Sequence, residues 1–369
     1  MIYLDNASTT ITSEEVVNEM VKFYKYAYGN PSSKHRFGKE VLGQVELARK
    51  RISSVLNCNS KEILFNSGAT EGINTLIRGF VEANIEKGQH VITTKVEHRA
   101  VLNTIRHLED IGIDVTYLDV NKNGLINITE LSEIIREDTI LFATLWVNNE
   151  TGVMQNIKEI SNELKEKSIA FFVDATQAVK KIPIDLSKVD IDMLCFSAHK
   201  IHGPKGVGGI YLKDGIKINP LIYGGAQEKG IRSGTLNVPG IMGMAKAMEL
   251  TDIENDDVKE ISKYLEKKLK YEFDCMIVGG DSNRSPYITN VIITGIDADI
   301  VIGALKETMI STGSACSSRI VEPSHVLKNM GFDDDSCFSS LRISISRYTT
   351  KNDIDSFIAE LQEVIEKLF

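Results

Sequence analysis

The sequence contains no run of 18 consecutive apolar residues, so no segment has the length and composition of a membrane-spanning helix. Its start, MIYLDNASTT, lacks the basic region and the apolar stretch of a secretory signal peptide, and we therefore expect a cytoplasmic protein. Positive charge is not in excess either, since the formal net charge is −9 over 369 residues. A general nucleic-acid-binding protein needs a basic face, so we expect direct contact with neither nucleic acid nor membrane, although a local basic patch is compatible with this charge.

Cysteine is scarce and shows no pairing pattern. There are five cysteines, an odd number without CxxC spacing: Cys58, Cys195, Cys275, Cys316 and Cys337. This pattern argues against a disulfide framework and against a zinc site, and we expect no metal centre. The thiols are therefore expected to be reduced, and one of them can be chemically active.

Apolar β-type runs alternate with helix-length stretches over the first 250 residues. The expected helices span 70–83, 99–111, 128–136 and 157–167. The expected strands span 62–66, 90–94, 115–120, 140–146, 169–175, 193–198 and 207–212. Strands that are apolar on both faces and separated by helices predict an α/β fold with a mostly parallel sheet between two helical layers.

The last third of the chain follows a different pattern. A long helical stretch over 241–272 is interpreted as a connector, and short strands at 276–280, 290–295 and 342–346 then precede a closing helix at 353–368. A chain of this length exceeds one ordinary core. We therefore expect a large domain over 15–250 and a smaller α+β domain that combines 1–14 with 251–369.

Two charged residues directly follow apolar strands, where ligand sites form in open parallel sheets. Lys200 precedes a glycine-rich loop, and partial burial would make its amine a Schiff-base nucleophile, although a surface lysine fits the same position. Asp174 ends the run AFFVD, and a protonated pyridine nitrogen would suit its carboxylate, although a helix-capping role fits as well. Gln177 either donates to a phenolic oxygen or completes that cap.

Two loops at the same carboxyl edge of the expected sheet carry further candidate site residues. The segment 65–71 turns sharply from a strand into a helix, whose free amides suit a phosphate, although Ser67 and Thr70 could be ordinary helix caps. His98 lies between a strand and a helix, where its ring could stack on a planar cofactor and transfer protons, or simply be a polar loop residue.

Among the thiols, Cys316 has the least apolar surroundings, in ISTGSACSSR. Cys195 lies in an apolar strand and is expected to be inert, because burial disfavours the thiolate. Cys337, near a helix start, is the rival reactive thiol. An incidental surface cysteine remains the alternative interpretation of Cys316.

Residues 119–130 match the acidic, amide, glycine and glutamate positions of a calcium-binding EF-hand loop. An EF-hand needs a helix on both sides, whereas the preceding VTYLDV is strand-like. We interpret the segment as a strand, a turn at 121–124, and a helix capped near Asn127 or Thr129. A calcium-binding module without catalytic activity stays open as an alternative, whereas a nucleotide-binding loop is disfavoured by the missing Walker and Rossmann patterns.

Taken together, these segments form a combination that is specific enough to indicate a protein family. VDATQ (173–177) with SAHKIHGPKG (197–206) resembles the aspartate-aminotransferase-type fold, fold type I, of pyridoxal-phosphate-dependent transferases. The further motifs that narrow the resemblance are LDNASTT (4–10), GNPSSKHRFG (29–38), NSGATE (66–71), TKVEHRAVL (94–102), VNNETGV (147–153), RSGT (232–235), TGSAC (312–316) and SSLRISISR (339–347). This set resembles the cysteine desulfurases of the NifS- and IscS-like branch.

The resemblance implies roles for individual residues. Lys200 would form the imine with pyridoxal phosphate, Asp174 would pair with the pyridine nitrogen, Gln177 would bond the phenolic oxygen, and His98 would stack on the ring as acid and base. Arg342 and Asn149 would bind the substrate carboxylate, with Asn149 also beside the cofactor. The phosphate would be held by Ala69, Thr70, Ser197 and His199, and by the partner subunit's Thr235 in a homodimer.

The implied reaction takes sulfur from L-cysteine, leaves L-alanine, and carries the sulfur as a persulfide on Cys316 to an acceptor protein. Iron–sulfur cluster assembly and thiolation of tRNA or a cofactor are both compatible with TGSAC. A selenocysteine lyase or an aminotransferase in which Cys316 is incidental is the alternative.

Overall fold

A computed structural model describes residues 1–250, 256–313 and 322–368. Its largest sheet has seven strands in the order β2-β8-β7-β6-β5-β3-β4. Strand β8 is antiparallel to both of its neighbours, and the remaining neighbours are parallel. The strands are β2 (Ile63–Asn66), β3 (His90–Thr94), β4 (Asp114–Leu118), β5 (Thr139–Leu145), β6 (Ala170–Asp174), β7 (Met193–Ser197) and β8 (Gly208–Leu212). The predicted α/β fold with a mostly parallel sheet is therefore confirmed.

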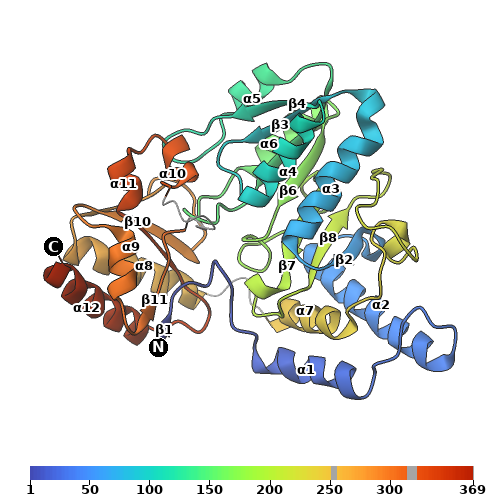
Figure 1. Cartoon of the computed structure of the whole chain (residues 1–369), viewed down its shortest axis with the longest axis horizontal. Coiled ribbons are helices and arrows are strands. Elements are labelled where there is room, and N and C mark those ends of the chain that lie inside the picture. The colour runs from blue at the N-terminus through green and yellow to red at the C-terminus, as the bar shows by residue number, and fades with distance from the viewer. Residues whose placement is uncertain (251–255, 314–321, 369) are drawn as a thin grey trace.

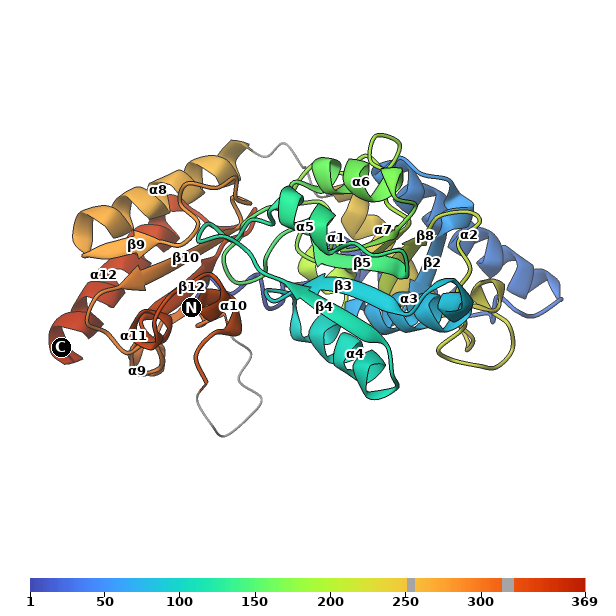
Figure 2. The same ribbon diagram turned by 90° about the horizontal axis from the view of Figure 1, so that it is seen from above.

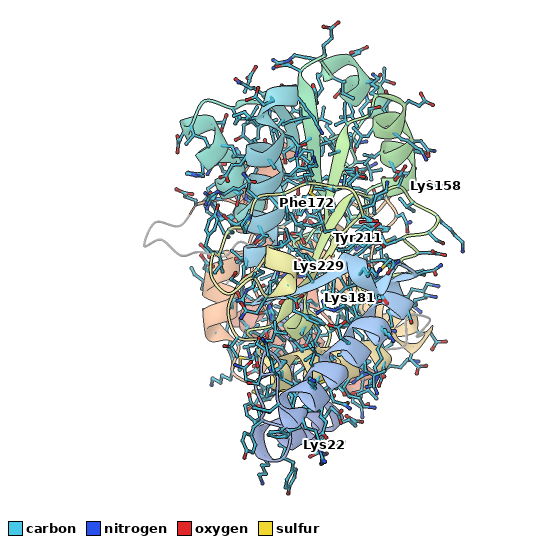
Figure 3. All side chains as sticks on the ribbon, turned by 90° about the vertical axis from the view of Figure 1, so that its right-hand side faces the viewer. Lys22, Lys158, Phe172, Lys181, Tyr211 and Lys229 are labelled. Atoms are coloured by element: carbon cyan, nitrogen blue, oxygen red, sulfur yellow. The ribbon has the colours of Figure 1, made fainter. Side chains whose placement is uncertain are left out.

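Both faces of this sheet are buried, which explains the continuous apolar runs. The neighbouring Phe171 and Phe172 of β6 point to opposite faces and belong to two different apolar clusters. One face packs against α3 (Ala69–Asn84) and α4 (Arg99–Asp110), and the other against α2 (Arg36–Leu56), α6 (Ile157–Glu166) and α7 (Val238–Leu250). Figure 2 shows α4 and α6 on opposite sides of the strands, and Figure 3 shows Phe172 in the interior while Lys22 and Lys158 lie at the periphery.

The predicted helical connector over 241–272 is two helices with different surroundings. The first, α7, is apolar on all sides and packs into the core of the large sheet, where Met244, Ala245 and Met248 are fully buried. It also packs against α1 (Glu14–Lys25). The second, α8 (Asp256–Glu272), packs against α12 (Lys351–Leu368) at the other end of the molecule (Figure 1). The stretch therefore runs from the apolar cluster of the large sheet to the smaller cluster, and its first helix is also part of the large core.

A second, smaller apolar cluster surrounds a three-stranded antiparallel sheet. Its central strand β10 (Ile288–Ile293) pairs with β9 (Cys275–Ile277) and β12 (Ser340–Ser344). Near the N-terminus, β1 (Ile2–Tyr3) pairs with β11 (Thr308–Met309). The predicted domain limits at 14 and 250 stay a prediction. The short helices of this half are α9 (Ala298–Ala304), α10 (His325–Asn329) and α11 (Asp334–Phe338).

The EF-hand-like segment adopts the strand–turn–helix conformation. Strand β4 ends at Leu118, Gly124 takes a positive φ of 78° in the turn, and α5 (Ile128–Ile134) begins after Asn127. The Asn127 side chain accepts from the amide of Thr129 at 3.0 Å and so caps the helix. A strand stands where an EF-hand needs its first helix.

Short 3₁₀ helices lie at Ser60–Glu62, Ile85–Lys87, Ala198–Lys200 and Glu228–Gly230. In the ranges that the structure describes, no helix combines the length and apolar character needed to cross a bilayer. The same ranges contain no cluster of three or more His, Cys, Asp or Glu side chains suited to a metal ion.

Candidate active site

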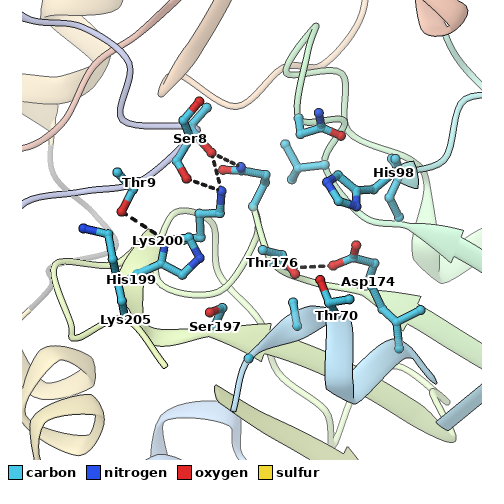
Figure 4. A pocket seen from close by; sticks show the side chains of 18 of the residues that line it. Ser8, Thr9, Thr70, His98, Asp174, Thr176, Ser197, His199, Lys200 and Lys205 are labelled. Carbon is cyan, nitrogen blue, oxygen red and sulfur yellow. Dashed lines mark hydrogen bonds between the residues drawn. The ribbon is translucent and has the colours of Figure 1, made fainter. Parts of the chain in front are cut away.

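A cavity of about 660 Å³ opens at the carboxyl edge of the large sheet (Figure 4). Segments from the whole chain line it, including the N-terminal residues Ala7, Ser8 and Thr9. It brings together these sequence-predicted residues: Ala69, Thr70, His98, Asn149, Asp174, Gln177, Ser197, His199, Lys200 and Arg342. Cys316 lies outside the described residues, and Thr235 lines a separate small pocket next to this one.

Lys200 ends the 3₁₀ turn that directly follows β7. Its ammonium group donates to the carbonyl oxygens of Ala7 at 2.7 Å and Ser8 at 2.6 Å. Burial, together with the positive charge of Arg342, lowers the pKa of Lys200 to about 8. About a tenth of the amine is therefore neutral at pH 7, and this neutral form is the one that acts as a Schiff-base nucleophile.

Asp174 is 6% exposed at the end of β6. Its Oδ1 accepts from the amide of Thr176 at 2.9 Å and lies 3.7 Å from the thiol sulfur of Cys195. In the described part of the chain it takes part in none of the ion pairs. A buried carboxylate that lines a cavity without an ion-pair partner suits a ligand with a cationic ring nitrogen.

His98 is the N-cap residue of α4, and its Nδ1 accepts from the amide of Ala100 at 3.1 Å. Burial lowers the pKa of His98, and the nearby charge of Asp174 partly opposes this effect. Because Nδ1 accepts a hydrogen bond, the neutral ring carries its proton on Nε2.

The start of α3 forms a cradle for an anion. Gly68 is the N-cap residue with φ of 149°, and no side chain caps this helix, so the alternative of ordinary capping by Ser67 is wrong. The uncapped amides of the first turn, at Ala69 and Thr70, line the cavity together with Ser197. A side chain at position 68 would approach the Ser197 hydroxyl to 3.5 Å.

His199 lies beside this cradle, where its Nδ1 is 3.1 Å from the Thr9 hydroxyl. Burial and the charge of Lys200 lower the pKa of His199 to about 4, so the ring is neutral near neutral pH. Lys205, which the sequence analysis did not single out, also lines the cavity and adds a positive charge. The cradle therefore combines free amides, hydroxyls and a cation, as a phosphate group requires.

Arg342 of β12 lines the opposite part of the cavity and is 4% exposed. Its guanidinium donates to the carbonyl of Asn149 at 2.9 Å, to the carboxylate of Asp5 at 2.8 Å and to the hydroxyl of Ser8 at 2.7 Å. Within the described ranges its Nε has no partner. A planar guanidinium at this place suits a carboxylate ligand.

The N-terminal segment is the part of the site that residue-level reasoning missed. Ala7 accepts through its carbonyl from both Lys200 and Gln177, the latter at 2.8 Å. Ser8 contacts Lys200 and Arg342. The motif LDNASTT contributes to the family resemblance, but backbone carbonyls carry no sequence signal of their own.

Cys337, the rival of Cys316 as reactive thiol, and Cys195, the thiol expected to be inert, are both buried. Cys195 is fully buried, and burial raises its pKa well above the ordinary value. Cys337 is 5% exposed, and burial raises its pKa to about 11. Neither thiol therefore forms a thiolate readily near neutral pH.

Comparison with known proteins shows the family to which the chain belongs. Residues 2–357 match the family "Aminotransferase class-V". "Cysteine desulfurase IscS" of Dictyoglomus turgidum is 41% identical to this chain over 100% of this chain and 95% of that protein. "Cysteine desulfurase IscS" of Buchnera aphidicola is 42% identical over 100% of this chain and 93% of that protein.

Comparison with solved structures indicates the same family. The structure of a "NIFS-LIKE PROTEIN" is 35% identical with a TM-score of 0.94 and covers 100% of both chains. A second, "SspA in complex with cysteine", is 35% identical with a TM-score of 0.87 over 95% of this chain and 100% of that one. The chain therefore belongs to the class-V aminotransferase family of pyridoxal-phosphate-dependent enzymes and, within it, to the cysteine desulfurases.

Proposed function

We propose that this enzyme removes sulfur from L-cysteine, leaves L-alanine, and carries the sulfur as a persulfide on Cys316. The observation that carries the proposal is one cavity that combines the Lys200 amine, the Asp174 carboxylate and the Arg342 guanidinium, in a chain similar to named cysteine desulfurases. A related solved structure was determined with cysteine.

The residues that line the cavity fit pyridoxal phosphate. Lys200 would hold it covalently, Asp174 would contact the ring nitrogen, and Gln177 the phenolic oxygen. The cradle of Ala69, Thr70, Ser197 and His199 would hold the phosphate. When bound, the cofactor supplies an electron sink for the α-carbon of an amino acid.

The side chains around the substrate would then have distinct tasks. Arg342 and Asn149 would bind the carboxylate of cysteine and so orient its α-carbon and sulfur. Lys200 would also transfer a proton at the α-carbon, a task that suits an amine whose pKa is lowered by burial. His98 holds a proton on Nε2, from which it would donate a hydrogen bond to the substrate.

The sulfur step belongs to Cys316. Its thiolate would form a bond to the cysteine sulfur while the carbon–sulfur bond breaks; the electron pair of that bond stays with the carbon, which is then protonated to alanine. Gly313, which lines the cavity, lies three positions before Cys316 in the sequence. The sulfur would next pass to an acceptor protein of iron–sulfur assembly or of a thiolation pathway.

We further propose a cytoplasmic homodimer, in which the partner subunit's Thr235 completes the phosphate site. The support is that Thr235 is exposed and outside the cavity of its own chain, although its motif matches the family. We also propose the division into a large domain over 15–250 and a small domain over 1–14 and 251–369, because the two halves have separate apolar clusters.

Replacement of Cys316 tests the sulfur step. The variant Cys316→Ser should keep the absorbance of the bound cofactor and its change on addition of cysteine, but form no alanine and no sulfide. Cys275→Ser, a change of a partly exposed thiol on β9, is the matched control and should behave like wild type. Alanine formation at the normal rate by Cys316→Ser would remove Cys316 from the reaction. A panel of amino acids scored for keto acid against alanine plus sulfide separates a desulfurase from an aminotransferase.

A further inference from the structure

The side-chain amide of Gln177 is held by a different partner at each of its two ends. Gln177 is 4% exposed and lines the cavity of the candidate active site. Its Nε2 donates to the carbonyl oxygen of Ala7 at 2.8 Å, and its Oε1 accepts from Nζ of Lys181 at 2.5 Å. Because a carbonyl oxygen can only accept and an ammonium group can only donate, these two contacts fix the orientation of the amide.

This orientation decides what a ligand in the cavity meets. An amide nitrogen carries two hydrogens, and Ala7 takes one of them. Since Gln177 lines the cavity, the other hydrogen is left for a ligand there. A deprotonated phenolic oxygen can only accept a hydrogen bond, so it suits this N–H and would be repelled by an amide oxygen in the same place.

Lys181 reaches Gln177 from the side away from this cavity. Turns of helical type follow β6, in which the amide of Ile182 donates to the carbonyl oxygen of Ala178 at 3.0 Å. Lys181 comes four positions after Gln177, the spacing at which side chains of a helical turn meet. It is not among the residues that line the active-site cavity, and instead lines a second cavity of about 830 Å³.

The burial of Lys181 costs free energy that a surface lysine would not lose. Lys181 is 7% exposed, and in the described ranges it forms none of the ion pairs. Burial, together with the positive charges of Lys200 and Arg342, lowers the pKa of Lys181 to about 7. Its Nζ lies 5.9 Å from the centre of the Tyr287 ring. The hydrogen bond to Gln177 forms in either protonation state, because a neutral amine keeps two N–H groups.

We propose that Lys181 is a positioning residue for the cofactor: it holds the Gln177 amide so that an N–H, and not the oxygen, faces the phenolic oxygen of pyridoxal phosphate. This inference rests on the proposed function, which assigns Gln177 to that oxygen. Lys181 itself touches neither cofactor nor substrate.

The orientation of Gln177 has a measurable effect on the bound cofactor. The negative phenolic oxygen attracts the proton of the imine that Lys200 forms. A hydrogen bond donated to this oxygen stabilises its charge and weakens that attraction. The imine should therefore lose its proton at a lower pH when Gln177 presents its N–H, and the absorbance of the cofactor reports this transition.

A pH titration of the absorbance of the holoenzyme, without cysteine, tests the proposal. Lys181→Met keeps the length of the side chain but removes the donor. The midpoint should rise by about one pH unit, the size expected for loss of a hydrogen bond to a charged group. Gln177→Leu removes the amide itself and should raise the midpoint by a similar amount.

The double variant separates an action through Gln177 from a direct effect of the lysine charge. If Lys181 acts through Gln177, Lys181→Met combined with Gln177→Leu should have the same midpoint as Gln177→Leu alone, because the second change removes a contact that no longer exists. Two rises that add up in the double variant would overturn the proposal, since Lys181 would then act on the cofactor through space.

Two further variants control for structural damage. Lys181→Arg keeps a group that only donates, has room toward the second cavity, and should hold the midpoint within about 0.3 units of wild type. Lys263→Met removes an exposed lysine from the wall of the same cavity and should leave the midpoint unchanged, because solvent screens its charge. Lys181→Leu replaces Lys181→Met where that variant does not fold.

A wild-type midpoint in Lys181→Met or Lys181→Leu would overturn the proposal. An equal rise in Lys263→Met would do so as well, by showing that any lost lysine charge has this effect. A wild-type enzyme that shows the transition but gives no alanine from cysteine would contradict the proposed sulfur transfer alone, because the titration is made without cysteine.

Discussion

At the scale of single residues, the most unusual group near the site is Glu97. Its side chain is fully buried; Oε1 accepts from Thr94 and Thr144, whereas Oε2 has no partner among the described residues. Burial, with a contribution from the charge of Asp174, raises the pKa of Glu97 to about 8. Near neutral pH Glu97 is therefore largely a neutral acid that anchors the loop of His98.

This raised pKa predicts a pH-dependent stability. Folded Glu97 binds a proton up to about pH 8, whereas the unfolded chain releases it near the ordinary glutamate pKa of 4.5. The stabilisation is fully present below the unfolded pKa and is lost as the pH rises through the folded pKa, by up to about 5 kcal/mol. Urea unfolding of wild type and Glu97→Gln at several pH values should show the variant gaining relative stability between about pH 5 and 8. A stability difference that does not change with pH would contradict the raised pKa.

At the scale of elements, a buried ion pair joins α2, β2 and the 3₁₀ turn Glu228–Gly230. Arg49 donates to both carboxylate oxygens of Glu228, at 2.9 and 2.8 Å, and Glu228 also accepts from the amide of Phe65 at 2.7 Å. The side chains are 9% and 2% exposed, and the guanidinium lies 4.5 Å from the centre of the Phe65 ring. This pair fixes the segment before Thr235 to the large sheet.

Removal of Glu228 should leave Arg49 with only the half-exposed Glu46 as a counter-charge. We expect Glu228→Ala to lower the free energy of unfolding by about 3–5 kcal/mol, because Arg49 then loses its buried counter-charge and both hydrogen bonds to it. Denaturant unfolding measures this change. The matched control, Glu40→Ala, breaks the exposed pair with Arg36 and should leave stability unchanged within error. A Glu228→Ala enzyme as stable as that control would show that the pair is dispensable.

The helices and strands also show how much of the fold can be predicted from the sequence. The seven strands of the large sheet lie within two residues of their predicted positions, because strands buried on both faces are continuous apolar runs. Helices α1 and α2 and the two-residue strands β1 and β11 were not predicted, since so short a strand is defined only by its partner. The sequence did not predict that α7 packs into the core of the large sheet, because apolar residues on most sides of a helix give no amphipathic signal of its position.

At the scale of the whole molecule, the site exists only because distant segments meet. The carboxyl-edge rule identified Lys200 and Asp174 from their own strands, and the cavity confirms that they lie together. Arg342 and Asn149 came from the family resemblance, and the contact between them spans 193 positions. The contact of Glu97 with Thr144 was not predictable, because no local pattern connects residues 47 positions apart in the chain.

The central claim is that one amine, that of Lys200, binds the cofactor. Two other lysines compete with it chemically: Lys205 lines the same cavity, and Lys181 is buried with a pKa lowered to about 7, chiefly by burial. Lys181 donates to Gln177 at 2.5 Å and is not among the residues that line the cavity.

The most direct test is to load the enzyme with pyridoxal phosphate, reduce it with borohydride, digest it, and locate the modified peptide by mass spectrometry. The account predicts a single stable adduct on Lys200 and its loss in Lys200→Ala. An adduct on Lys181 or Lys205, or no adduct at all, would contradict it.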